Sequence, residues 1–166
     1  MKYSLVLMMI FAIIKINAQD IFSYAKSDNV TELSKVKGDL NAKNSQGYTP
    51  LILAVYNNSY NTAKWLLDNG AQPDLQDDNG NTALMGAVFK GYKDMIPLLL
   101  SHKADINMRN YNDATALIYA AVFGKNEMVK LLIENGADKR AKDNRGNTAL
   151  QHAVMQGNQE AVQLLH

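Results

Sequence analysis

Cysteine is absent from this 166-residue sequence, and proline and tryptophan are scarce, with three residues and one residue respectively. Without cysteine the chain can form no disulfide, perform no thiol chemistry and carry no lipid on a cysteine, as a bacterial lipoprotein does. Apolar residues make up 47% of the chain and charged residues 20%, which is typical of a folded globular domain. The fold therefore has to be stabilised by a continuous apolar core.

An excess of charge of one sign is also absent. Seventeen Lys and Arg residues accompany sixteen Asp and Glu residues, which gives a formal net charge of +1. A nucleic acid or an anionic membrane attracts a protein through a clear excess of positive charge. The composition therefore predicts neither of them as a partner.

Catalytic and metal-binding motifs are missing as well. The sequence has no nucleophile elbow, no glycine-rich phosphate loop and no dinucleotide fingerprint. Its histidines are His102, His152 and His166. They lack the spacing of metal ligands, and there is no cysteine to complete a zinc site. We therefore expect no enzyme activity, no cofactor and no metal site.

Residues 77–80, Asp-Asp-Asn-Gly, weakly resemble part of a calcium-binding loop. With Gly80 at the sixth position of such a loop, Leu75 falls at the first position and Gly86 at the twelfth, where carboxylates are required. The match fails for this reason. Asp77 is better interpreted as a turn residue that bonds its own backbone.

The first eighteen residues differ from the rest of the chain. Lys2 gives a short positive start, an apolar run of ten residues follows at Leu5–Ile14, and Ala18 supplies the small residue before a cleavage site. This order predicts a signal peptide at residues 1–18 that is cleaved after Ala18. An uncleaved anchor is disfavoured because ten apolar residues fall short of the roughly 20 needed to span a bilayer. We expect an exported protein, periplasmic or secreted, that is not attached to a membrane after cleavage.

A period of 33 residues organises the remaining sequence, and no insertion interrupts it. The period is visible in five columns of equivalent positions. They are Thr49, Thr82, Thr115 and Thr148; Leu51, Leu84, Leu117 and Leu150; Ala54, Ala87, Ala120 and Ala153; Asn58, Gly91, Gly124 and Gly157; and Leu66, Leu99, Leu132 and Leu165. A period of this length is typical of a solenoid of stacked units.

Each column has a physical role in a pair of helices. The Thr hydroxyl accepts a hydrogen bond at a helix start, where Pro50 suits the first helical position. The Ala column lets a neighbouring helix approach closely, and Gly or Asn adopts the left-handed conformation that ends a helix. A second helix follows, with apolar residues at helical spacing, and polar loops then occupy residues 76–81, 109–114 and 142–147. One such unit cannot bury its apolar face alone, so the units are expected to stack.

These units resemble the ankyrin repeat through Gly47-x-Thr49-Pro50-Leu51-x-x-Ala54, its counterparts from Gly80 and Gly146, and Leu131-Leu132-Ile133-x-x-Gly136-Ala137-Asp138. The resemblance implies an all-α solenoid of stacked helix-turn-helix pairs with projecting hairpin loops. After the signal peptide, an ankyrin-repeat domain is expected over residues 19–166. Its expected parts are a degenerate N-terminal cap at 19–43, full repeats at 44–76, 77–109 and 110–142, and an incomplete last repeat at 143–166.

Several positions depart from the family pattern. The His that usually follows Thr-Pro-Leu is replaced by Ile52, Met85, Ile118 and Gln151. Asp113 and Lys103 stand where Gly is usual, and each is expected to reduce stability locally. Pro97 lies near the first turn of its second helix, which it is expected to bend rather than break.

The sequence stops at His166 without a polar outer cap, so the last helix pair is expected to be exposed or to be covered by a partner or a second copy. We therefore expect a monomer, or weak self-association through this end.

The resemblance also implies that another protein binds to a concave face formed by the loop tips and the exposed side of each first helix. Carried over column by column, the candidate contacts are Tyr48, Tyr56, Asn57, Asn81, Phe89, Lys90, Tyr111, Asn112, Phe123, Arg145, Met155 and Gln156. Aromatic side chains are typical of protein-binding surfaces because they bury a large area with few rotatable bonds. The alternative is that Tyr56, Phe89 and Phe123 only pack between adjacent helices.

Ankyrin proteins with a secretion signal are mainly bacterial, and some small ones support haem catalases. The function expected from the resemblance is a non-catalytic protein–protein interaction module in the cell envelope. The alternative is an accessory factor that stabilises an exported enzyme such as a haem catalase. No residue of the sequence distinguishes the two.

Overall fold

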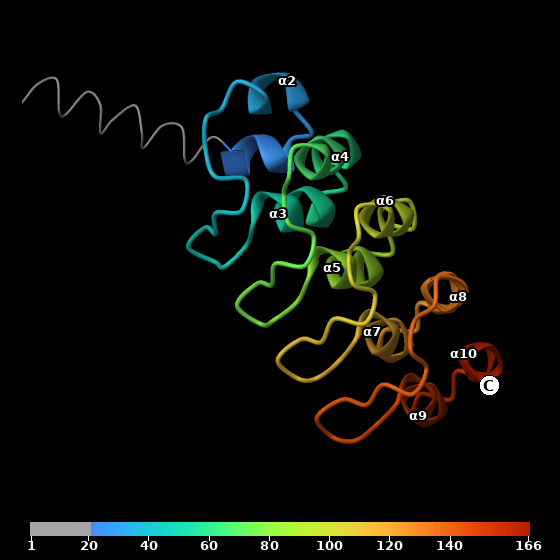
Figure 1. The fold of residues 1–166 in the computed structure, drawn as a ribbon. Coiled ribbons are helices and arrows are strands. Elements are labelled where there is room, and N and C mark those ends of the chain that lie inside the picture. The colour runs from blue at the N-terminus through green and yellow to red at the C-terminus, as the bar shows by residue number, and fades with distance from the viewer. Residues whose placement is uncertain (1–20) are drawn as a thin grey trace, which may run out of the picture.

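The computed structural model describes residues 21–166, which form two layers of short helices stacked like a staircase (Figure 1). The helices are α2 (Val30–Leu33), α3 (Pro50–Tyr56), α4 (Tyr60–Asp68), α5 (Ala83–Lys90), α6 (Met95–Ser101), α7 (Ala116–Val122), α8 (Asn126–Glu134), α9 (Ala149–Met155) and α10 (Gln159–Leu165). Residues 21–26 are helical as well, and residues 21–166 contain no strand. The predicted all-α solenoid is confirmed, whereas the predicted signal peptide at residues 1–18 lies outside the described residues.

The helices divide into two layers. We call α3, α5, α7 and α9 the inner helices and α4, α6, α8 and α10 the outer helices. Successive inner helices pack against one another, and each also packs against the outer helix that follows it. A loop projects before each inner helix, on the side away from the outer layer (Figure 1).

The start and the end of each inner helix follow from single residues. The Thr hydroxyls accept hydrogen bonds from the backbone N–H three residues later, at 3.2 to 3.4 Å. The residues in the left-handed conformation at the following turn are Asn58, Gly91, Gly124 and Gly157, with φ of 57°, 78°, 62° and 65°. The predictions for the Thr and Gly columns are confirmed.

The core lies between the two helix layers and runs the length of the stack. All four residues of the Ala column are 0% exposed, so the absence of a larger side chain lets the helices approach. Leu66, Leu99 and Leu132 of the outer helices are also 0% exposed, and Leu165 is 4% exposed. A fully buried Leu contributes about 1.5–3 kcal/mol relative to an exposed one.

The departures from the family pattern have local consequences. Lys103 and Asp113 both adopt the left-handed conformation, with φ of 65° and 57°, which costs a residue other than Gly about 1 kcal/mol. Pro97 does not interrupt α6, which continues to Ser101. Because Pro97 has no N–H to donate to Lys93, the Lys93 carbonyl accepts from the N–H of Ile96 at 3.2 Å, in a tighter turn.

Residues 21–33 cover the first outer helix. Asp28 accepts hydrogen bonds from the backbone N–H of Thr62 at 2.7 Å and from the side-chain amide of Asn61 at 2.9 Å. The hydroxyl of Ser59 donates to the carbonyl of Lys26 at 3.1 Å. These contacts bind the N-terminal segment to the start of α4.

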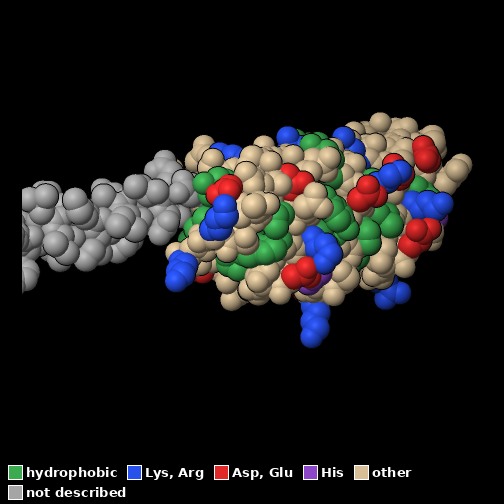
Figure 2. Space-filling view, turned by 90° about the horizontal axis from the view of Figure 1, so that it is seen from above, with side chains coloured by type: hydrophobic (Ala, Val, Ile, Leu, Met, Phe, Trp, Pro, Cys, Tyr) green, Lys and Arg blue, Asp and Glu red, His purple; other side chains and the backbone are tan. Residues whose placement is uncertain are grey.

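The outer surface carries charges of both signs. Viewed from above, Lys and Arg side chains lie beside Asp and Glu side chains, with apolar side chains between them (Figure 2). Within residues 21–166, no helix has both the length and the apolar character required to cross a membrane.

Candidate protein-binding surface

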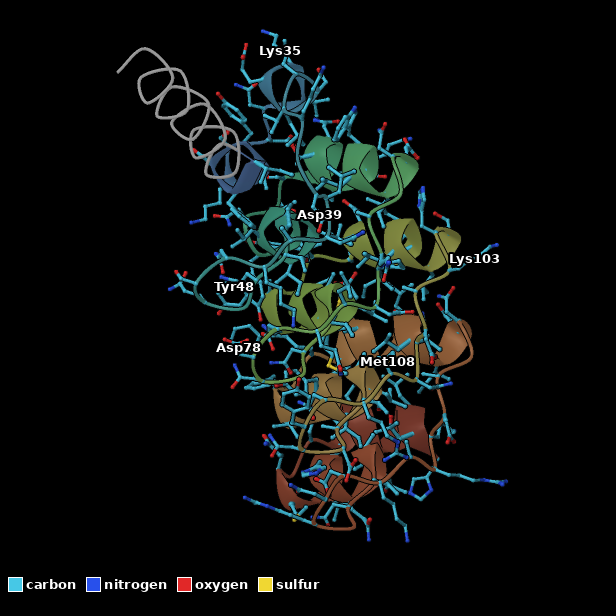
Figure 3. The ribbon with its side chains drawn as sticks, turned by 60° about the vertical axis from the view of Figure 1, so that its left-hand side comes forward. Lys35, Asp39, Tyr48, Asp78, Lys103 and Met108 are labelled. Carbon is cyan, nitrogen blue, oxygen red and sulfur yellow. The ribbon has the colours of Figure 1, made fainter. Side chains whose placement is uncertain are left out.

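The projecting loops and the exposed sides of the inner helices form one continuous surface. We call it the loop–helix surface, and it comprises loop residues 44–48, 77–81, 110–114 and 143–147 together with α3, α5, α7 and α9. Tyr48 and Asp78 lie on successive loops at one side of the stack, and Lys103 lies at the opposite side (Figure 3).

Each loop is closed by a carboxylate or amide at its first position. Asp77 Oδ1 accepts hydrogen bonds from the backbone N–H groups of Asn79 and Asn81, both at 2.8 Å. Asn44, Asn110 and Asp143 accept the equivalent pairs of bonds in their own loops. The interpretation of Asp77 as a turn residue is confirmed.

Neighbouring loops are also bonded to one another. The N–H of Tyr111 donates to the carbonyl of Asn79 at 3.3 Å, and the N–H of Asn144 donates to the carbonyl of Asn112 at 2.9 Å. These bonds join the last three loops to one another and give their backbone groups partners.

Tyr56 closes the surface between the first two repeats. Its ring lies over Gly86 of α5, where a Cβ atom would be 3.3 Å from the ring. The ring centroids of Tyr48 and Tyr56 are 5.8 Å apart, and the Lys90 ammonium is 5.8 Å from the Tyr56 centroid. Burial, and then the nearby carboxylate of Asp77, raises the pKa of Tyr56 to about 12. The packing alternative therefore applies to Tyr56.

Asn81 does not lie on the exposed surface, contrary to the prediction. It is 8% exposed, and its Oδ1 accepts from Asn110 Nδ2 at 3.0 Å and from the Tyr119 hydroxyl at 2.9 Å. Burial raises the pKa of Tyr119, which keeps the hydroxyl protonated as a donor. Asn81 is therefore a link between the second and third repeats, and it has no free amide oxygen for a partner.

Phe89 and Phe123 remain open to solvent on adjacent repeats. Their ring centroids are 4.9 Å apart in an edge-to-face arrangement, yet the residues are 41% and 44% exposed. The Tyr119 ring also packs edge-to-face against the Phe123 ring, with a centroid distance of 5.4 Å. The pair of Phe89 and Phe123 forms an exposed aromatic contact in the middle of the loop–helix surface.

The remaining predicted contacts are exposed. They are Asn57, Lys90, Tyr111, Asn112, Arg145, Met155 and Gln156. Tyr111 is 68% exposed and Met155 is 63% exposed. Two of the amides have partners within the chain, because Asn57 donates to Leu53 O and Gln156 donates to Val122 O, both at 2.8 Å.

A cleft of about 260 Å³ opens between the third and fourth repeats. It is lined by Asn110, Asn112, Ala114, Ile118, Tyr119, Val122, Phe123, Asp143, Asn144, Arg145 and His152. The structure thus brings three predicted contacts, Asn112, Phe123 and Arg145, to one place. Phe123 supplies an apolar wall and Arg145 a cation.

Asp143 and His152 are in hydrogen-bond contact at the edge of this cleft. His152 Nε2 and Asp143 Oδ2 are 2.7 Å apart, and their side chains are only 16% and 9% exposed. Burial of Asp143 raises its pKa, but the N–H of Asn147, the His152 ring and the N–H of Arg145 outweigh burial and hold that pKa below its ordinary value. Asp143 is therefore ionised at neutral pH, with hydrogen-bond partners for both of its oxygens.

Sequence reasoning missed Tyr119 and His152 as residues of this surface. The period itself offered the signal, because Leu53, Gly86, Tyr119 and His152 form one column that faces the loops. Two polar residues in an otherwise apolar or small column mark the place where the cleft opens.

A shallower cleft of about 420 Å³ lies on the outer layer, lined by Asn58, Tyr60, Asp94 and Pro97. It offers one aromatic side chain and one carboxylate. Across residues 21–166, no cluster of His, Asp or Glu side chains has the arrangement needed to hold a metal ion.

The comparison with protein families agrees with this architecture. A family model described as ankyrin repeats (3 copies) matches residues 18–110 and 105–166. The chain has no match among curated proteins.

Proposed function

Because this chain belongs to the ankyrin-repeat family, we propose that it is a non-catalytic module that binds another protein through the loop–helix surface. Ankyrin repeats generally mediate protein–protein interactions. The exposed pair Phe89 and Phe123 is the observation that supports this surface as the binding site. Their edge-to-face contact holds both rings in place, and 41% and 44% of their surfaces still face solvent.

Burial of this pair beneath a partner would be favourable for two reasons. Apolar area removed from water contributes about 25 cal/mol per Å². Rings that are already fixed lose little conformational entropy on binding, and aromatic residues near the centre of a surface often dominate the binding energy. The neighbouring amides and Lys90 then supply a polar rim around the rings.

The experiment is affinity capture from a lysate of the source cell with the folded protein as bait. The double substitution Phe89→Ala and Phe123→Ala should abolish capture of any specific partner. Tyr60→Ala is the matched control, because Tyr60 is 40% exposed but lies on outer helix α4. Capture that survives the double substitution and is lost with Tyr60→Ala would place binding on the outer layer instead.

We propose further that the protein acts outside the cytoplasm, in the cell envelope or beyond it. The order of charge, apolar run and small residue in residues 1–18 supports this proposal. Mass spectrometry of the native protein tests it, because export predicts a mature chain that starts at Gln19. The accessory role for an exported enzyme, such as a haem catalase, is the special case in which that enzyme is the captured protein.

A further inference from the structure

The cleft between the third and fourth repeats has a distinct chemistry, because its own carboxylate is already hydrogen-bonded within the chain. Asp143 Oδ1 accepts from the N–H groups of Arg145 and Asn147, both at 2.9 Å, and Oδ2 faces His152 at 2.7 Å. Each oxygen of the Asp143 carboxylate therefore has at least one hydrogen-bond partner within the chain, although Asp143 keeps its negative charge.

Two hydrogen-bond donors that line the cleft, in contrast to the Asp143 carboxylate, have no partner within the described chain. The guanidinium of Arg145 has no hydrogen bond and no ion pair with any described residue, although its backbone N–H is bonded to Asp143. Asn112 accepts from Asn144 Nδ2 at 3.3 Å, which leaves the Asn112 amide nitrogen as a donor. Guanidinium and amide donors together recognise a carboxylate.

The segment that carries Arg145 has further uncompensated cations. Residues 138–145 contain four cations, Lys139, Arg140, Lys142 and Arg145, and two carboxylates, Asp138 and Asp143. Asp138 accepts from the N–H of Arg140 at 2.8 Å, and none of the four cations pairs with a carboxylate of the described chain. Side chains that end in nitrogen project from this last part of the stack (Figure 3).

The outer helices show the opposite arrangement. Lys64 pairs with Asp68 at 2.6 Å, and Lys93 pairs with Glu127 at 3.1 Å. The mixture of colours in Figure 2 agrees with this compensation. Residues 138–145 thus combine four cations without an ion pair and two carboxylates, although the whole chain is close to neutral.

An apolar wall stands directly beside these donors. Ile118 and Val122 line the cleft from α7, and the exposed ring of Phe123 stands at its edge. A ligand that bonds to the donors and also packs against the apolar wall carries a carboxylate next to an apolar side chain. A cleft of about 260 Å³ has room for a large side chain but not for a folded domain.

We propose that this cleft binds an acidic segment of the partner protein, with a carboxylate at Arg145 and a neighbouring aromatic or aliphatic side chain against Phe123. This proposal rests on the proposed function, because it names the partner's chemistry at the same surface. Asp113, at the tip of the third loop, repels a segment whose acidic residues lie on that side. The segment is therefore oriented with its carboxylate towards the fourth repeat.

The test uses a capped pentapeptide, Gly-Glu-Phe-Glu-Gly, titrated into the ¹⁵N-labelled protein. The amide signals of Asn112, Phe123 and Asn144 should shift, and those of Tyr60 should not. Replacing both Glu residues of the peptide by Gln should weaken binding about tenfold, since charge-assisted hydrogen bonds are roughly twice as strong as neutral ones. Replacing its Phe by Ala should weaken binding about threefold or more.

Variants of the protein sharpen this test. Arg145→Gln should weaken binding of the pentapeptide about tenfold. Arg140→Gln is the matched control, because it removes the same charge from the same segment but does not line the cleft, and it should weaken binding less than about threefold. A thermal melt of both variants verifies that they remain folded, as expected for exposed residues.

Three results would overturn the proposal: equal binding of the Glu and Gln peptides, equal effects of the two Arg variants, or binding of a single-stranded oligonucleotide in preference to the acidic peptide. None of these would contradict the proposed function, which the Phe89 and Phe123 substitutions test by themselves. Loss of capture with those substitutions, together with no preference for Glu, would retain the protein-binding role and remove the acidic partner.

Discussion

The two halves of the loop–helix surface share one backbone plan but use it differently. In the half formed by residues 44–109, the closed half, the Tyr56 ring lies over Gly86 and fills the space between the first two repeats, and the far edge of this half, at Phe89 and Lys90, is open. In the half formed by residues 110–166, the open half, Tyr119 and His152 occupy the column of Gly86 and a cleft remains. The residue in the Gly86 column thus decides what the neighbouring aromatic ring does. Beside Gly86 the Tyr56 ring packs inside the stack, and beside Tyr119 the Phe123 ring stays exposed.

The largest expected loss of stability comes from a substitution in the closed half. Tyr56→Ala removes a ring that contacts Tyr48, Lys90 and the backbone of α5, and it should lower the free energy of unfolding by about 2–3 kcal/mol. Phe123→Ala, in the open half, should lower it by only about 1 kcal/mol because the ring is 44% exposed. Urea denaturation followed by circular dichroism measures both. Equal losses would mean that the two halves do not differ in packing.

The next effect concerns the link between the halves. Asn81→Ala removes the acceptor of the half-buried Tyr119 hydroxyl, and it leaves Asn110 Nδ2 with only its longer bond, 3.4 Å, to the Tyr119 hydroxyl oxygen. The free energy of unfolding should fall by about 2 kcal/mol. Asn79→Ala is the control, because Asn79 is exposed and should change stability by no more than about 0.5 kcal/mol. A loss below that of the control would show that Asn81 is replaceable by water.

Much of this architecture could be predicted from the sequence because its determinants are local. A Thr cap, a left-handed Gly and a small Ala each act within one helix pair, so their columns reveal their roles directly. The burial of Asn81 could not be predicted in this way, because its partner Tyr119 is 38 residues away along the chain. The cleft was missed for a similar reason, since His152 meets Asp143 across nine residues and only the folded loop brings them together.

A third prediction concerns polar groups in the closed half. Thr62 is 0% exposed, and its hydroxyl has no hydrogen-bond partner within residues 21–166, whereas the hydroxyl of Ser59 in the same region donates to Lys26 O. Thr62→Val should therefore raise the free energy of unfolding by about 1 kcal/mol, and Ser59→Ala should lower it by about 1 kcal/mol. Thermal unfolding measured by calorimetry distinguishes the two signs. A destabilised Thr62→Val variant would indicate that the hydroxyl has a partner in solution.

The smallest expected effect is a difference between the two halves in how their stability depends on pH. The pKa of Tyr56, about 12, lies above its ordinary 10.0, so its neutral form stabilises the fold fully below pH 10 and this contribution is lost as pH rises towards 12. The pKa of Asp143 lies below its ordinary 3.8, so its ionised form contributes above that pH and the contribution is lost as pH falls further. The closed half therefore weakens in alkali and the open half in acid.

Two substitutions isolate these contributions in urea denaturation across the pH range. Tyr56→Phe cannot ionise, so it should lose less stability than the unsubstituted protein between pH 10 and 12, and the two should respond alike in acid. Asp143→Asn should be less stable at pH 7, and its deficit should shrink below pH 3.8 as Asp143 of the unsubstituted protein becomes protonated. A pH profile of Tyr56→Phe parallel to that of the unsubstituted protein in alkali would show that the ring is not held in the closed packing over Gly86.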